Sequence, residues 1–98
     1  MIIPNQIQIA GKIVDIIIDP KYCGEEKVYG KEIYDRNKIY LDDPIVSGIS
    51  KEKQEQTFIH EILHYIYDVI GKNDTEMNSE GVICPVSELL YQVFKQIK

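Results

Sequence analysis

Hydrophobic residues in the first 41 positions occur in short runs that are rich in β-branched side chains. The run from Lys12 to Asp19 is mostly Ile and Val and is too short for a stable helix, which predicts a largely buried strand that ends before Pro20. Two further runs, Val28 to Tyr34 and Lys38 to Leu41, are separated by three polar residues that suit a tight connection. They predict an antiparallel hairpin, so this part of the chain is expected to form a short sheet.

After position 50 the hydrophobic residues recur at steps of three and four, which predicts a helix from about Lys51 to Ile70. Ser47 or Ser50 can cap its N-terminus, and Gly71 can end it. The apolar face of this helix is expected to pack on the sheet and consists of Phe58, Ile59, Ile62, Leu63, Ile66, Val69 and Ile70.

A polar segment, Lys72 to Ser79, precedes a second helical stripe over Val82 to Ile97, with Pro85 near its first turn. The predicted order is therefore sheet, helix, helix. A chain of 98 residues has room for one hydrophobic core, so residues 1–98 are expected to be a single domain. The fold class is α+β: a short twisted sheet with antiparallel pairing, packed on a long helix and followed by a C-terminal helix.

Composition excludes some functions. The formal net charge is −5 and the only arginine is Arg36, which argues against binding to nucleic acid. The first ten residues do not have the pattern of a secretory leader, and no run approaches the roughly 18 to 20 apolar residues that span a bilayer. We expect a cytoplasmic protein that does not bind membranes. In a reducing compartment Cys23 and Cys84 are expected to be free thiols.

The segment His60-Glu61-Ile62-Leu63-His64 is the most informative feature of the sequence. Residues four apart share a helix face, so both imidazoles can bind one zinc ion at about 2.0–2.1 Å. Glu61 lies beside that face, where it can accept a proton from a water molecule activated by the zinc. These residues predict a catalytic zinc site with Glu61 as general base.

His60 and His64 are the only histidines, so a third protein ligand must be a carboxylate or a thiolate. Glu80 is the preferred residue because the start of the second helix can approach the first helix from the side. Cys84, one turn further on the same face, is the main alternative. The other carboxylates that remain open as ligands are Glu76, Asp74 and Glu88, and Asp68 on the main helix.

Two further roles are predicted. If Lys38 to Leu41 is an exposed edge strand beside the active helix, Ile39, Tyr40 and Leu41 offer backbone hydrogen bonds to an extended peptide; the alternative is a purely structural strand. An oxyanion donor must be a tyrosine, Arg36 or a lysine. Tyr91 lies on roughly the Glu80 face of the second helix and is the preferred donor, although a tyrosine there is also typical of a half-buried core.

The chain resembles the minimal gluzincins, the small phage-borne and mobile-element metallopeptidases in which an HExxH helix follows a short twisted sheet. The resemblance is carried by the hairpin Tyr34 to Leu41, by Thr57-Phe58-Ile59 leading into His60 to His64, and by Leu90-Tyr91-Gln92-Val93 near the end. It implies a zincin-like fold, with Glu80, ahead of Val82-Ile83, as third zinc ligand. The chain departs from the pattern at Ile83-Cys84-Pro85, where a proline near the helix start affects the aim of Glu80.

The expected function is therefore zinc-dependent hydrolysis of peptide bonds in a peptide or protein substrate, by a monomer or weak oligomer. One alternative is a binding module that keeps the zincin-like fold, has little or no activity and docks to a phage or host protein. Another is a self-inhibited precursor whose own terminus fills the cleft.

Overall fold

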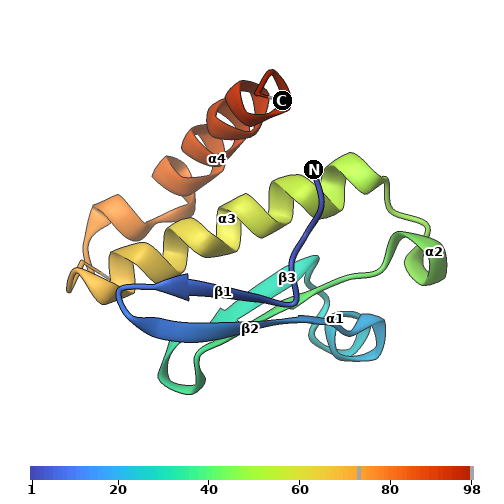
Figure 1. The fold of residues 1–98 in the computed structure, drawn as a ribbon, viewed down its shortest axis with the longest axis horizontal. Coiled ribbons are helices and arrows are strands. Elements are labelled where there is room, and N and C mark those ends of the chain that lie inside the picture. The colour runs from blue at the N-terminus through green and yellow to red at the C-terminus, as the bar shows by residue number, and fades with distance from the viewer. Residues whose placement is uncertain (73, 98) are drawn as a thin grey trace.

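A computed structural model describes residues 1–72 and 74–97 and shows a mixed sheet of four strands (Figure 1). Strands β2 and β4 pair in parallel, and the two outer pairs, β1 with β2 and β3 with β4, are antiparallel. The order across the sheet is β1-β2-β4-β3. The strands are β1 (Gln6–Ile9), β2 (Lys12–Ile18), β3 (Gly30–Ile33) and β4 (Lys38–Leu41).

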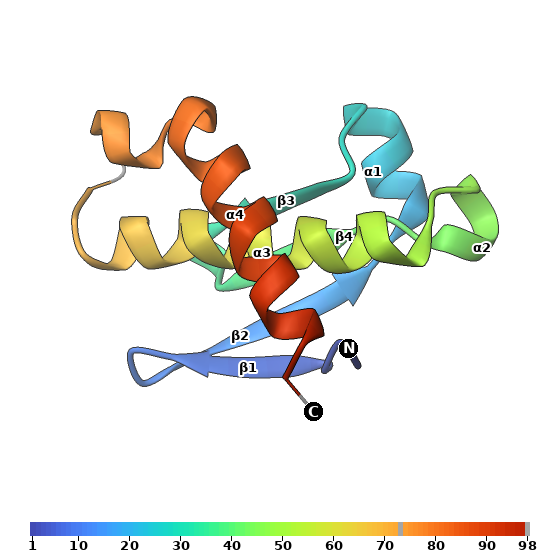
Figure 2. The ribbon, with the colours of Figure 1, turned by 90° about the horizontal axis from the view of Figure 1, so that it is seen from above.

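The two long helices form two further layers above the sheet. Helix α3 (Lys51–Val69) lies across one face of the sheet, and α4 (Glu80–Lys95) crosses α3 on the side away from the strands (Figures 1 and 2). None of the helices in the described part of the chain is long and apolar enough to cross a membrane. The short elements are α1 (Pro20–Glu26), α2 (Pro44–Ser47) and the 3-10 turns η1 (Tyr34–Arg36) and η2 (Glu76–Asn78). The predicted α+β class, with a sheet followed by two long helices, is confirmed.

The core lies between the sheet and α3. Alternate residues of a strand point to the same face, so one face of β2 and β4 supplies the buried aliphatic side chains. The core cluster consists of Val14, Ile16, Ile39, Leu41, Phe58 and Tyr65. The prediction that the first run is largely buried is only partly right, because Ile13 is 59% exposed and Ile18 is 44% exposed. The long helices cover one face of β2 only.

Strand β1 was not predicted. Its sequence, Gln6 to Ile9, alternates polar and apolar residues with the period of a half-buried strand, and this was the available signal. Ala10 and Gly11, with φ of 52° and 78°, form the two-residue turn into β2. Positive φ at both turn positions matches the twist of an antiparallel hairpin.

The predicted hairpin is confirmed, but the expectation that Lys38 to Leu41 forms an exposed edge is wrong. Strand β4 lies between β2 and β3, and its Ile39 and Leu41 side chains are fully buried. After β2 the chain runs through α1 to the edge of the sheet opposite β1. It forms β3 at that edge and then returns as β4, between β3 and β2. The edge strand that contacts α3 on this side of the sheet is therefore β3.

Helix starts follow local capping chemistry. Ser50 caps α3 by accepting a hydrogen bond of 2.9 Å from the backbone N–H of Lys53, and Gly71, with φ of 74°, follows the end of the helix. Strand β2 ends at Ile18, before Pro20, as predicted, and the Asp-Pro pairs after β2 and β4 also begin α1 and α2. Asp19 and Asp43 are the N-caps, and a proline occupies the first helical position in each case.

Helix α4 begins two residues earlier than predicted, at Glu80, and ends at Lys95. Ser79 precedes its first turn, and the backbone N–H of Ile83 donates to the Ser79 carbonyl at 2.9 Å. This early start places Pro85 inside the helix, beyond the first turn in which it was expected. Glu80 thereby becomes the first residue of the helix.

Gly30 permits the close contact between β3 and α3. A Cβ atom at this position would lie 2.6 Å from Cγ2 of Thr57 and 2.9 Å from the carbonyl oxygen of Tyr40. Both distances are shorter than van der Waals contact, and the second neighbour is backbone that cannot move independently. A glycine is therefore needed where the edge strand approaches the helix.

We expect Gly30→Ala to lower the free energy of unfolding by about 1–3 kcal/mol, because the added methyl group forces β3 away from α3. Chemical denaturation measures this difference. Gly24→Ala is the matched control, since a Cβ there meets nothing within 4 Å and the residue lies in α1. A Gly30→Ala variant as stable as the unmodified protein would contradict the prediction.

Candidate metal centre

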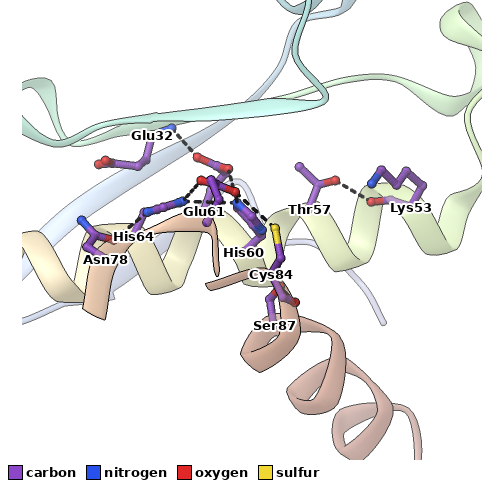
Figure 3. Close-up of polar contacts among 10 residues, drawn as sticks. Glu32, Lys53, Thr57, His60, Glu61, His64, Asn78, Cys84 and Ser87 are labelled. Carbon is purple, nitrogen blue, oxygen red and sulfur yellow. Dashed lines mark hydrogen bonds and ion pairs between the residues drawn. The ribbon is translucent and has the colours of Figure 1, made fainter. Parts of the chain in front are cut away.

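His60 and His64 project from the same face of α3 toward the first turn of α4 (Figure 3). Their rings meet edge to face with centroids 4.9 Å apart, and the two Nε2 atoms are separated by 3.2 Å. Both side chains are largely buried, with 19% and 14% of their surface exposed. The four-residue spacing thus brings the two ring nitrogens to one point, as the sequence predicts.

Glu80 brings its carboxylate to the same point from α4. Its Oε1 lies 2.7 Å from Nε2 of His64, and its Oε2 lies 3.0 Å from Nε2 of His60. The first turn of α4 is anchored by Ile83, which is fully buried. The position of Glu80 therefore depends on helix packing.

These atoms fit a zinc site. Two ligand atoms bound at about 2.0–2.1 Å in a tetrahedron are separated by about 3.3 Å. The two Nε2 atoms are 3.2 Å apart, and each lies within hydrogen-bond distance of a different oxygen of the Glu80 carboxylate, at 3.0 and 2.7 Å. A single divalent cation would satisfy all three groups at once. His60, His64 and Glu80 could therefore hold zinc.

Cys84 adjoins this cluster. Its thiol lies one turn after Glu80 and donates a hydrogen bond of 3.3 Å to Glu80 Oε2. Ligand atoms of Cys84, Glu80 and His60 all lie within 4.8 Å of one another. Cys84 is exposed and Cys23 is buried, and both are free thiols, as the sequence predicts.

Glu61 lies beside the histidines, at the edge of the sheet. Its Oε1 accepts a hydrogen bond of 2.9 Å from the backbone N–H of Glu32 in β3, and its Oε2 lies 3.8 Å from Nε2 of His60. Burial raises the pKa of the Glu61 carboxyl, whereas the nearby His64 and the hydrogen bond from Glu32 lower it in part. The carboxylate is thus held in place with a proton affinity above that of an ordinary glutamate.

Asn78, in the turn before α4, orients His64. Its Oδ1 lies 2.6 Å from Nδ1 of His64 and can accept the proton of that nitrogen (Figure 3). Nδ1 protonation leaves the Nε2 lone pair directed at Glu80, as metal binding requires. Asn78 was not predicted, because nothing in a polar loop sequence shows which side chain turns toward the helix.

The surroundings of His60 and Glu80 favour the protonation forms that can bind a metal ion. Burial lowers the pKa of His60, against the opposing effect of Glu80. Partial burial of Glu80 acts to raise its pKa, but hydrogen bonds from Cys84 and His64 and the histidine charges outweigh this effect and lower it. Neutral imidazole and ionised carboxylate are the forms that bind divalent cations.

The cluster lies in a cleft of about 510 Å³ between β3 and α4. The edge strand supplies one wall, with Gly30 and Lys31, and α4 supplies the other, with Ser87 and Glu88. The floor is α3. The structure therefore places an open edge strand beside the histidines, although it is β3 and not the predicted β4.

Several predicted site residues lie elsewhere. Tyr91 is buried and donates a hydrogen bond of 2.8 Å to Glu55, so it belongs to the α3–α4 contact and does not line the cleft. Glu76 is exposed in η2 and is also absent from the cleft wall. Asp74 is exposed in the loop before η2.

The strand residues predicted to bind substrate also lie away from the site. Neither Ile39, Tyr40 nor Leu41 reaches the cleft, because β3 lies between β4 and the site. Asp68 adjoins Glu32 rather than the two histidines.

Comparisons of the chain with protein-family models, with curated proteins and with solved structures gave no match.

Asn78→Ala is expected to weaken zinc binding by about 10–100-fold, because His64 then loses the acceptor that fixes its tautomer and ring orientation. Competition with a chromophoric chelator measures the affinity. Met77→Ala, in the same turn and on an exposed side chain, is the control and should bind zinc as the unmodified protein does. Equal affinities for the two variants would remove Asn78 from this role.

Glu32 gives a pH-dependent prediction. Burial and the nearby carboxyl groups of Asp68 and Glu61 raise its pKa to about 8, whereas an unfolded glutamate ionises near pH ~4.3. The protonated carboxyl therefore contributes stability that is complete below the unfolded pKa and is lost as pH rises through about 8. Its Oε2 is buried without a hydrogen-bond partner among the described residues.

Glu32→Gln should accordingly raise the midpoint of thermal unfolding at about pH 9 and leave it unchanged near pH ~4, because glutamine mimics the protonated acid. The scans are recorded with a chelator present so that metal binding does not contribute. Glu25→Gln, at an exposed position, should change neither midpoint. A stabilisation of the Glu32 variant that is the same at both pH values would contradict the shifted pKa.

Proposed function

We propose that this protein is a zinc-dependent peptidase in which His60, His64 and Glu80 hold the metal and Glu61 is the general base. One observation carries the proposal: the Glu80 carboxylate meets both histidine Nε2 atoms, at 2.7 and 3.0 Å, while Glu61 lies alongside. Two histidines and a carboxylate are a known ligand set of catalytic zinc. A structural role for the histidine pair alone would not require a carboxylate from another helix.

A zinc ion in this site would supply Lewis acidity, which polarises a carbonyl group and makes a water molecule more acidic. Glu61 takes the proton from that water and returns it to the departing amine. Its raised pKa suits this exchange, because a carboxyl group of higher proton affinity is a better base and can still release the proton. The backbone N–H of Glu32 keeps its Oε1 fixed while Oε2 faces the site.

The shape of the cleft favours a peptide substrate. Strand β3 forms its wall and lies at the edge of the sheet, so its outer backbone groups can pair with an extended chain. The N–H of Glu32 already points outward, to Glu61. A peptide aligned along β3 would therefore pass directly over the general base. The role that the sequence assigned to Ile39, Tyr40 and Leu41 moves to the outward-facing backbone of β3 at Gly30 and Glu32.

Glu61→Gln is expected to retain one zinc ion per chain and to lose cleavage by at least about 100-fold, since general-base catalysis contributes roughly 10²–10⁴-fold. Zinc is measured by elemental analysis and native mass spectrometry, and cleavage with a quenched fluorescent peptide library. Glu52→Gln, on the exposed part of the same helix, is the control and should keep both properties.

Retained hydrolysis in Glu61→Gln would exclude the proposed role of Glu61. Unmodified protein that is purified without chelators and contains no stoichiometric zinc would contradict the peptidase as a whole. That outcome would favour the alternative of a zincin-like binding module that docks to a partner protein.

A further inference from the structure

The thiol of Cys84 lies where it can complete the metal site. Cys84 and Glu80 are four residues apart in α4, so their side chains share one face of the first turns. The thiol points at Glu80 Oε2, the same oxygen that lies 3.0 Å from Nε2 of His60. We propose that Cys84 is a fourth protein ligand of the zinc ion and closes the site in its resting state. This inference rests on the proposed zinc site.

The distances support coordination by sulfur. In a tetrahedral site with Zn–O near 2.0 Å and Zn–S near 2.3 Å, an oxygen and a sulfur ligand are separated by about 3.5 Å. The Sγ of Cys84 lies 3.3 Å from Glu80 Oε2 and within 4.8 Å of the ring nitrogen of His60. The sulfur therefore lies beside two of the three proposed ligands, Glu80 and His60. Metal binding replaces the thiol proton, which now bridges to Glu80.

The backbone around Cys84 is fixed independently of the metal. The carbonyl of Cys84 accepts a hydrogen bond of 2.9 Å from the hydroxyl of Ser87, which is fully buried. Ile83, the preceding residue, is fully buried. A fixed helical turn therefore holds the thiol near His60 and Glu80, while the side chain itself remains exposed.

A fourth protein ligand has a direct consequence for catalysis. Structural zinc sites have four protein ligands, whereas catalytic sites keep one position for water. With sulfur bound, Glu61 has no water to deprotonate. Hydrolysis then requires Cys84 to leave the metal, and its exposed position allows the thiol to turn into solvent or react with a thiol reagent.

Cobalt substitution tests this ligand directly. Cobalt(II) bound to a thiolate shows an intense charge-transfer absorption in the near ultraviolet, which nitrogen and oxygen ligands do not give. We expect this band in the unmodified protein and in Cys23→Ala, and its loss in Cys84→Ala and Cys84→Ser. Cys23 is the matched control because it is the other cysteine and is buried outside the cluster. The visible cobalt bands, due to His60, His64 and Glu80, should persist in every variant.

A second readout uses thiol access. In Cys23→Ala, zinc should slow alkylation of Cys84 by iodoacetamide at least about tenfold, and removal of zinc by chelation should restore the rate, because a metal-bound sulfur is a poor nucleophile. Peptide hydrolysis by the zinc form of Cys84→Ala should be severalfold faster than that of the unmodified protein. Equal hydrolysis rates would overturn the closure of the site.

The failures are distinguishable. One cobalt ion per chain without the charge-transfer band, or a band that persists in both Cys84 variants, overturns the inference and leaves the zinc peptidase standing. A protein that binds neither cobalt nor zinc overturns both. A band that depends on Cys84, in a protein that cleaves no peptide even as Cys84→Ala, supports the ligand and counts against the peptidase.

Discussion

Helix α3 uses three of its own faces for three different contacts, and the rest of the protein is arranged around this helix. One face packs Phe58 and Tyr65 against the sheet and supplies much of the core. A second carries His60 and His64 into the cleft. A third meets α4, where Tyr91 donates its hydrogen bond to Glu55. Because one helix makes all these contacts, the position at which it packs on the sheet fixes where the site lies. Gly30 permits this close packing, since any side chain there would collide with Thr57.

The site is completed by parts of the chain that have no catalytic signature of their own. The backbone of β3 holds Glu61, and an asparagine in a short turn holds His64. Such supporting contacts orient ligands and bases, and they depend on where the backbone passes more than on residue type. A small domain can thus build a polar site economically, by using an edge strand and a helix start that the fold already requires.

Acidic groups crowd the region around the cluster, and burial separates their roles. Glu80 faces two imidazoles, which with Cys84 lower its pKa, whereas burial, together with the nearby Asp68 and Glu61, raises the pKa of Glu32. Glu61 lies between these two environments. Neighbouring carboxyl groups can therefore differ in protonation state at one pH, which would allow one to serve as ligand and another as base.

The sequence alone determined the features that depend on local spacing. The helix around His60 and His64, the hairpin before it and the α+β order follow from residue periods and capping, because these act over a few neighbouring positions. The tertiary structure decided everything that depends on distant segments. The parallel pairing of β2 with β4 made β3 the edge strand, and the crossing of α4 over α3 brought Glu80 and Cys84 to the histidines while turning Tyr91 toward Glu55. A helical period shows which residues share a face, but only packing shows what that face meets.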